Sequence, residues 1–316
     1  MIRCFVSAPC RSEVAGGPCG GGREASNFSN VKDRVTLCRF LCVVQVGYLQ
    51  FSPSYLDVDA NLQAVDARLS SLEVDLLVLP ELFTSGYFFH SQEDLTQVAE
   101  PIPGGRSTTA LRDWASSLNA TLVAGLAEQD GPRIFNSAVA VQPDGTLDTY
   151  RKVHLYYEEK ALFTPGDLGF PVVEVRGGAK TSVRLGLMVC FDWYFPESAR
   201  TLALQGADII AHPSNLVLPH CPDAMPVRAR ENHLFTVTAN RHGEEEKDGE
   251  TLTFIGTSEV CDPTGTILKR GARDCDEIGI VNIDPTKARD RRLNAYNDVM
   301  EDRRPDMYTT PEEEVS

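Results

Sequence analysis

Two short segments, far apart in the chain, follow one pattern and constrain the fold more than any other feature. Residues 74–80 read VDLLVLP and residues 207–213 read ADIIAHP, so each has an aspartate before a mostly aliphatic run that a proline closes. Short apolar runs bounded by turn residues are typical of buried β-strands. Because a helical stretch precedes each run, the repetition suggests two similar halves, with chance similarity between two buried strands as the alternative.

The other apolar segments alternate between helical and strand character. Helices are predicted for residues 57–72, 108–118, 196–206 and 226–232. Strands are predicted for residues 40–46, 121–127, 136–142, 147–150, 172–175, 183–189, 234–239, 251–261 and 278–283. Strands that alternate with helices, with hairpins interspersed, indicate a layered α/β sandwich. No linker divides it, and so a single domain is predicted over residues 35–290.

The two ends of the chain differ from this central part. Residues 1–34 are rich in glycine, contain three cysteines and have few apolar residues. They lack the apolar stretch of a secretory signal and are predicted to be a flexible N-terminal extension. Residues 291–316 are strongly charged and are expected to lie on the surface or to contact another subunit.

Composition excludes several classes of protein. The net charge is −15, from 45 acidic and 30 basic residues, which argues against nucleic acid and anionic membranes as partners. The acidic run Glu244-Glu245-Glu246 is expected on a solvated surface. No apolar run is long enough to span a bilayer. Nine cysteines without C-x-x-C spacing, and six histidines without zinc-ligand spacing, predict no metal site and a reducing compartment, the cytoplasm.

Cys190 lies in a short turn between the predicted strand 183–189 and a helix that begins near Pro196. Backbone N–H groups and a nearby cation can stabilise a thiolate there, although a buried structural cysteine is the common alternative. Glu81 and Lys152 each follow a predicted strand too, and so one sheet edge could gather all three. A carboxylate could then remove the thiol proton, and an ammonium could stabilise an oxyanion. Taken singly, either residue is more often simply solvated.

The segments around these residues resemble the three signatures of the nitrilase, or carbon–nitrogen hydrolase, superfamily. They read ELFTSGY from Glu81, YRKVHLYYEEKALFTPGD from Tyr150 and VCFDWYFPESAR from Val189. NRHGEE from Asn240 and FIGTSEVCDPTG from Phe254 are also similar to the family. Three signatures in the family's order are far more specific than one. The resemblance covers about residues 35–290 and implies a four-layer αββα sandwich.

The resemblance also implies the site residues. It assigns a Glu-Lys-Cys triad to Glu81, Lys152 and Cys190, and a second active-site glutamate to Glu159. The backbone N–H of Phe191 would complete an oxyanion hole with the Lys152 ammonium. Glu81 would act as the base, Cys190 would attack the substrate carbon to form a thioester, and no metal or organic cofactor would be needed.

Three further residues, Tyr87, Trp193 and Asn215, are candidates for the lining of the substrate pocket. The Phe191-Asp192 pair after the cysteine resembles the amidase and carbamoyl-amide branches, whereas the CFDW sequence also resembles small aliphatic nitrilases. We therefore expect hydrolysis of a non-peptide carbon–nitrogen bond in a small aliphatic amide or nitrile, with release of ammonia and a carboxylic acid.

Other functions remain open at this level. An N-carbamoyl amide would need a basic residue for its carboxylate, and Arg228 or Arg230 could supply it. A non-catalytic binding or assembly module of the same fold is a second alternative. A Cys-His protease that uses His154 or His212 is a third. The resemblance further implies a homodimer or a larger homo-oligomer.

Overall fold

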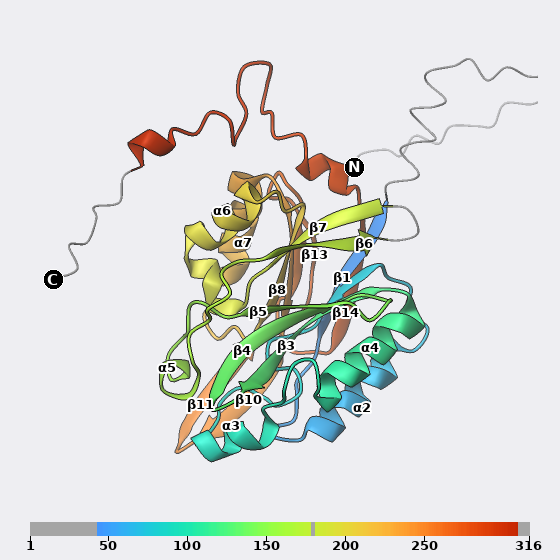
Figure 1. Ribbon diagram of the computed structural model, residues 1–316, viewed down its shortest axis with the longest axis vertical. Helices are drawn as coiled ribbons and strands as arrows, with labels where there is room; N and C mark the ends of the chain where they lie inside the picture. The colour runs from blue at the N-terminus through green and yellow to red at the C-terminus, as the bar shows by residue number, and fades with distance from the viewer. Residues whose placement is uncertain (1–42, 178–180, 309–316) are drawn as a thin grey trace, which may run out of the picture.

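The computed structural model describes residues 43–177 and 181–308, and they form two six-stranded sheets packed face to face between helices (Figure 1). The four-layer αββα sandwich implied by the resemblance is confirmed. Residues 1–34 and 309–316 lie outside the described residues, so the predicted N-terminal extension stays a prediction. Among the helices of the described residues, none is long and apolar enough to cross a membrane.

The first sheet has the strand order β14-β1-β2-β3-β4-β5. Its strands are β14 (Glu277–Ile283), β1 (Val44–Gln50), β2 (Leu76–Val78), β3 (Thr121–Asp130), β4 (Arg133–Val141) and β5 (Leu147–Arg151). The three strands β1, β2 and β3 run parallel, and the others pair antiparallel. Helices α2 (Val58–Leu69) and α4 (Arg106–Leu118) cover the outer face, where Leu69 and Leu111 share a buried cluster with Leu77.

The second sheet has the order β13-β12-β9-β8-β7-β6 and the same plan. Its strands are β13 (Ile267–Arg270), β12 (Glu259–Cys261), β9 (Phe235–Asn240), β8 (Ile209–Ser214), β7 (Thr181–Leu187) and β6 (Val172–Gly177). Here β7, β8 and β9 form the parallel trio. Helices α6 (Pro196–Leu204) and α7 (Cys221–Asn232) contribute Leu202 and Met225 to the adjoining core.

The repeated sequence pattern corresponds to the middle strand of each parallel trio. Asp75 precedes β2, and its carboxylate accepts a hydrogen bond from the backbone N–H of Gln45 at 2.7 Å. Asp208 precedes β8, and its carboxylate accepts one from the backbone N–H of Arg184 at 3.0 Å. Each aspartate therefore satisfies a donor of the neighbouring parallel strand, one residue before the parallel pairing begins, and the prediction of two similar halves is confirmed.

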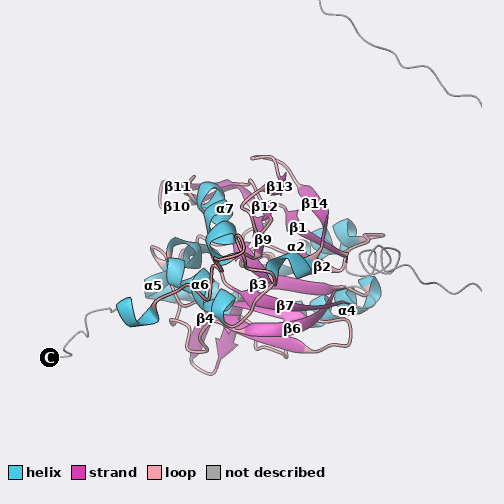
Figure 2. Cartoon of the chain, turned by 90° about the horizontal axis from the view of Figure 1, so that it is seen from above, coloured by secondary structure: helices cyan, strands magenta, loops and turns pink. Residues whose placement is uncertain are grey.

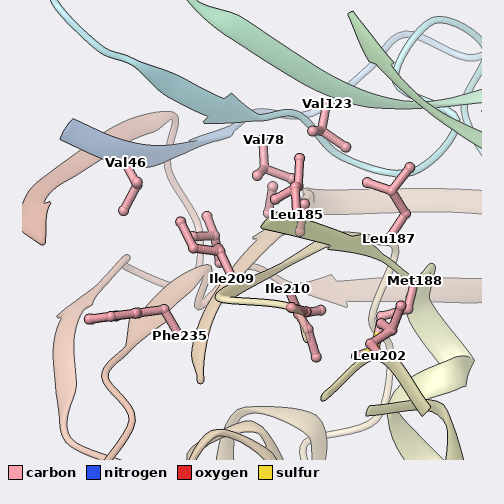
Figure 3. Packing of buried hydrophobic residues seen from close by; sticks show 14 of the residues in the cluster. Val46, Val78, Val123, Leu185, Leu187, Met188, Leu202, Ile209, Ile210 and Phe235 are labelled. Atoms are coloured by element: carbon pink, nitrogen blue, oxygen red, sulfur yellow. The ribbon is translucent and has the colours of Figure 1, made fainter. Parts of the chain in front are cut away.

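The two sheets meet through aliphatic side chains. Val46, Val78 and Val123 of the first sheet face Leu185 and Ile209 of the second (Figure 3), and all five are at most 1% exposed. Because side chains alternate across a strand, one face of each sheet reaches this layer and the other reaches the helices. Burying each such side chain contributes about 1.5–3 kcal/mol before the entropy of ordering is counted.

Several boundaries differ from the predictions. The strand expected at 40–46 is observed at Val44–Gln50, and residues 40–42 lie outside the described residues. It continues past Gly47 because the backbone of residues 48–50 pairs with residues 277–279 of β14. The buried Gln50 amide also donates to the carbonyls of Ala272 and Cys275 at 2.7 and 2.9 Å. The single strand expected at 251–261 is wrong. It is divided into β11 (Glu250–Ile255) and β12 by a turn in which Gly256 has a φ of +56°.

Helices α3 (Gln92–Val98) and α5 (Glu159–Leu162) and strands β10 (His242–Lys247) and β13 have no counterpart among the predictions. Helix α3 begins at the capping residue Ser91, and strand β10 pairs with β11 as a separate two-stranded sheet. This hairpin lies at the edge of the molecule in both views (Figures 1 and 2). The polar sequence of β10, HGEEEK, explains why no strand was expected. The remaining elements are the short helix α5 and three 3-10 turns: η1 (Cys190–Tyr194), η2 (Pro285–Ala288) and η3 (Pro305–Met307).

Candidate active site

The residues of the predicted triad all lie just beyond the ends of strands. Glu81 is in the turn after β2, Lys152 directly follows β5, and Cys190 begins η1 after β7. Their exposed fractions are 0%, 1% and 5%. Gly125 on β3 allows the close approach of the first segment, since a Cβ atom there would lie 2.4 Å from the Cα of Glu81. The fold thus brings together residues that span more than 100 positions of the chain.

A buried ammonium joins two carboxylates at this place. Lys152 Nζ donates to Glu81 Oε1 at 2.7 Å and to Glu159 Oε1 at 2.8 Å. Asn136 on β4, which the sequence did not single out, donates its Nδ2 to Glu81 Oε1 at 2.7 Å. Burial alone would lower the pKa of Lys152, but the charges of Glu159 and Glu81 outweigh it and hold the pKa above its usual value. The lysine is therefore charged at neutral pH.

The carboxyl of Glu159 experiences opposing influences. Burial raises its pKa above the usual value and the charge of Glu81 adds to this, whereas Lys152 and the hydroxyl of Tyr87 act in the opposite direction. Two carboxyl oxygens, Glu81 Oε2 and Glu159 Oε2, are buried without a hydrogen-bond partner. The cluster consequently presents more acceptors than its own donors satisfy.

Cys190 has a strained backbone and a thiol whose pKa is raised. Its φ of +40° is a conformation that costs a non-glycine residue about 1–3 kcal/mol. Burial raises the pKa of the thiol well above its usual value, the carboxylates of Glu81 and Glu159 raise it further, and the Lys152 ammonium partly opposes them. The backbone N–H of Asn215 also lowers the pKa of the thiol. A base is accordingly required before this sulfur can act as a nucleophile.

Neither histidine near the motifs is placed as that base. His212 Nε2 bonds to the backbone carbonyl of Cys190 at 2.9 Å, and burial lowers the pKa of this imidazole to about 4. His154 Nδ1 is 2.8 Å from Asp192 Oδ1, and its ring stacks on Phe195 with centroids 3.7 Å apart. Both rings have structural partners, and this arrangement does not support the Cys-His protease alternative.

Asp192 connects the cysteine turn to the lysine segment. Its buried carboxylate accepts from the Tyr150 hydroxyl at 2.7 Å, from the Val189 N–H at 2.8 Å and from the His154 N–H at 3.2 Å. Tyr150 lies in β5, two residues before Lys152, and so one side chain sets the relative position of both segments. The sequence signal was an aspartate inside the otherwise aromatic turn CFDWYF.

A small hollow opens at Cys190. It is lined by Tyr156, Cys190, Phe191, Trp193, Asn215 and residues 216–218. Both side-chain amide atoms of Asn215 are buried without a partner. The sequence did not identify Tyr156, whose ring packs 5.0 Å from that of Phe191. The described lining is therefore aromatic and aliphatic, with one free amide beside the thiol.

The remaining candidates lie outside this lining. The Tyr87 hydroxyl donates to Glu159 Oε1 at 2.7 Å. Tyr87 therefore contacts the second glutamate and is not part of the lining at Cys190. Arg228 donates to the carbonyl of Trp193 at 3.2 Å and to Glu231 at 2.9 Å, and Arg230 is exposed on α7. Within residues 43–177 and 181–308, no group of three or more His, Cys, Asp or Glu side chains could hold a metal ion.

Comparisons with known proteins identify the family. The family described as carbon-nitrogen hydrolase matches residues 45–292. A nitrilase of Pyrococcus abyssi is 45% identical over 269 residues, which cover 84% of this chain and 99% of that protein. An (R)-stereoselective amidase of a Pseudomonas species is 38% identical over 233 residues, or 70% of this chain and 81% of the relative.

A solved structure shows the same architecture. The carbon-nitrogen hydrolase from Helicobacter pylori G27 superposes with a TM-score of 0.74 and 28% sequence identity, covering 84% of this chain and 97% of that one. The family match, the identity of the relatives and the shared fold lead to one conclusion. The chain belongs to the carbon–nitrogen hydrolase family of the nitrilase superfamily and is an enzyme of that class.

Proposed function

We propose that this enzyme cleaves small aliphatic amides or nitriles through a thioester on Cys190, with Glu81, Lys152 and Glu159 as the other catalytic groups. The observation that carries the proposal is the buried Lys152 ammonium, bonded to both carboxylates, within electrostatic range of the Cys190 thiol. Such a cluster is costly to bury and is typical of a site that shifts protons.

The first half of an amide reaction forms the thioester. The Cys190 sulfur bonds to the substrate carbon while its proton passes to Glu81, and the carbonyl electrons move to the oxygen. The Lys152 ammonium and the backbone N–H of Phe191 stabilise that oxyanion. When the intermediate collapses, the carbon–nitrogen bond breaks, and the proton on Glu81 leaves with the ammonia.

The second half regenerates the enzyme. Water adds to the thioester and gives a proton to Glu81, and the carbon–sulfur bond then breaks. The proton returns to the sulfur, and the carboxylic acid leaves. With a nitrile, the first adduct is a thioimidate, which takes up one water and loses ammonia to reach the same thioester. Glu159 orients the Lys152 ammonium in both cases, because the two share a 2.8 Å hydrogen bond.

The polar groups of the site favour an amide as the first substrate class. Glu81 Oε2, Glu159 Oε2 and Asn215 Oδ1 are buried acceptors without a partner. A carboxamide NH₂ supplies two donors to such atoms, whereas a nitrile supplies none, and a buried acceptor left unpaired costs about 1–3 kcal/mol. A nitrile is the second candidate, since the Pyrococcus abyssi relative is named a nitrilase. The described lining includes no basic side chain, which gives no support to an N-carbamoyl substrate with a carboxylate.

Paired substrates test this assignment. We expect ammonia release from short aliphatic amides with a kcat/KM at least about tenfold higher than from nitriles of the same carbon skeleton, as one unpaired acceptor would require. Ammonia is measured with an enzyme-coupled assay. Protein alkylated with iodoacetamide serves as the blank. Faster turnover of every nitrile than of its amide would reverse the assignment, and no turnover of either series would favour a binding module.

We also propose that the chain assembles as a homodimer or a larger homo-oligomer. Residues 290–308 follow the last strand (Figure 1), and although Arg291 and Met300 contact residues of α6, other side chains of the segment face away from the sandwich. They expose large apolar side chains, with Leu293 67%, Tyr296 92% and Met307 67% exposed. Tyr194, the last residue of η1, is 54% exposed, and Leu204, the last residue of α6, is 48% exposed. Large apolar side chains left exposed on these segments are candidates for contact with another subunit.

Light scattering after size exclusion tests the assembly. We expect a particle of at least twice the 34.7 kDa chain mass. Because the net charge of −15 makes subunits repel at low ionic strength, the larger species should gain population as salt is added. A monomer at both low and high salt would contradict the proposal. A chain ending at Asp290 is the matched control for the contribution of the last segment.

A further inference from the structure

The acidic run on β10 contains a buried carboxylate that the proposed mechanism does not use. Glu244 and Glu246 are exposed as the sequence predicted, but Glu245 is only 8% exposed, and its assignment to the solvated surface is wrong. Its carboxylate forms an ion pair with Arg241, which is itself 1% exposed. Two opposite charges removed from water together are costly unless both are fully hydrogen-bonded.

The other hydrogen bonds of Glu245 hold the loop that follows Glu81. Glu245 Oε2 accepts from the backbone N–H groups of Tyr87 at 3.0 Å and of Phe88 at 2.7 Å. Gly86 allows this approach, because it has a φ of +78° and a Cβ atom there would lie 2.7 Å from Glu245 Oε1. The charge of Glu245 is thus used to fix the backbone from which the Tyr87 side chain projects.

The packing of the rings fixes the direction of that side chain. The Arg241 guanidinium lies 4.0 Å from the centre of the Phe254 ring, and the Phe254 ring meets Tyr87 edge-on with centroids 6.0 Å apart. The Tyr87 hydroxyl then donates to Glu159 Oε1 at 2.7 Å. That oxygen also accepts from Lys152, and so Glu159 is held from two sides.

We infer that Tyr87, held by the Arg241–Glu245 pair, is a positioning residue that fixes the orientation of Glu159 toward the Lys152 ammonium. Glu159 begins a helix of only four residues, which provides little support of its own. With Oε1 engaged by two donors, Oε2 is the oxygen left without a partner. The inference rests on the proposed role of Glu159, and it gives a function to the NRHGEE segment that the triad leaves unexplained.

Tyr87→Phe tests the inference, because it removes the hydroxyl and keeps the ring. We expect kcat for the best amide to fall about tenfold with KM changed less than about twofold, as for one lost hydrogen bond to a charged group. Tyr87 favours the ionised carboxylate, so its loss should raise the pKa of Glu159 and shift the acid limb of the kcat profile to higher pH. The groups that face Glu159 electrostatically are Lys152, Glu81, Tyr87, Cys190 and Tyr156.

Tyr55→Phe is the matched control. Its hydroxyl donates to Asp94 at 3.1 Å and accepts from the His90 N–H at 2.9 Å, without contact to Glu159. We expect its kcat and pH profile to equal those of the wild type. Glu245→Gln should lower kcat as Tyr87→Phe does, and the double variant should lose no more than the worse single one, since residues that act in series are not additive.

A second readout separates failure of this inference from failure of the proposed function. The alkylation rate of Cys190 by iodoacetamide is followed against pH by peptide mass spectrometry, which distinguishes it from the exposed Cys275. Tyr87→Phe should shift this profile while Tyr55→Phe should not. Unchanged kcat, pH profile and alkylation in Tyr87→Phe would overturn the inference even if the wild type hydrolyses amides. Wild-type protein without turnover, but with the shifted alkylation profile, would reject the proposed substrates alone.

Discussion

Replacement of Cys190 by serine is expected to lower ammonia release at least about a thousandfold, with the fold unchanged, because an alcohol is a much weaker nucleophile than a thiol. The site offers no other nucleophile at that point, since the described lining of the cavity contains only this thiol. The side chains are nearly the same size, and so the melting temperature should change by only a few degrees. Steady-state ammonia release and a thermal melt measure the two effects.

Cys275→Ser is the matched control for this variant. Cys275 is a free and exposed cysteine in the loop before β14, and its replacement should leave turnover unchanged. Rapid quenching followed by mass spectrometry should find an acyl group on the Cys190 peptide of the wild type and none on the same peptide of Cys190→Ser. Full turnover by Cys190→Ser would reject the thioester.

Lys152→Met is expected to abolish activity and also to destabilise the protein by about 3–5 kcal/mol, the usual cost of removing one partner from a buried ion pair. The ammonium is fully buried and holds Glu81 and Glu159 at 2.7 and 2.8 Å. Methionine fills a similar volume without charge and leaves both carboxylates without their cation. Urea unfolding and ammonia release at the same pH measure the two losses. Lys160→Met, an exposed lysine eight residues further on, should change neither.

The destabilisation of Lys152→Met should depend on pH in a defined direction. Glu159 already has a raised pKa in the folded protein, and loss of the ammonium removes the main charge that opposes this shift. A carboxyl whose folded pKa exceeds its unfolded value favours folding below the unfolded pKa of about 4.3, and this contribution is lost as the pH rises through the folded pKa. The stability deficit relative to wild type should therefore be smaller at pH 5 than at pH 8. A stability deficit that is the same at pH 5 and pH 8 would show that the charge of Lys152 does not affect the pKa of Glu159.

Much of the fold could be predicted because its pattern is local. The apolar runs around Leu77 and Ile210 are buried, as expected for central strands of a sheet. An aspartate, Asp75 or Asp208, precedes the run in each half. The polar β10 and the break at Gly256 were missed, since a strand of glutamates has no hydrophobic pattern and a turn with positive φ leaves little signal in one sequence.

The chemistry of the site was predictable by residue type, and its supporting groups were not. Glu81, Lys152, Glu159 and Cys190 were named from their motifs, whereas Asn136, Asp192 in its connecting role and Glu245 were found only in the structure. Each of these three acts through a hydrogen bond to a segment at least 40 residues away. Sequence spacing carries no information about such contacts.

The sequence by itself determined the layered fold, the family and the kinds of group that the site contains, because hydrophobic periodicity and motif chemistry are written along the chain. Only the tertiary structure decided which charges are removed from water. Glu245 and its neighbours Glu244 and Glu246 are the same residue type in one run, yet only the middle one is buried. Side chains alternate across a strand, and the packing of Arg241 and Tyr87 against one face alone determines which glutamate is desolvated.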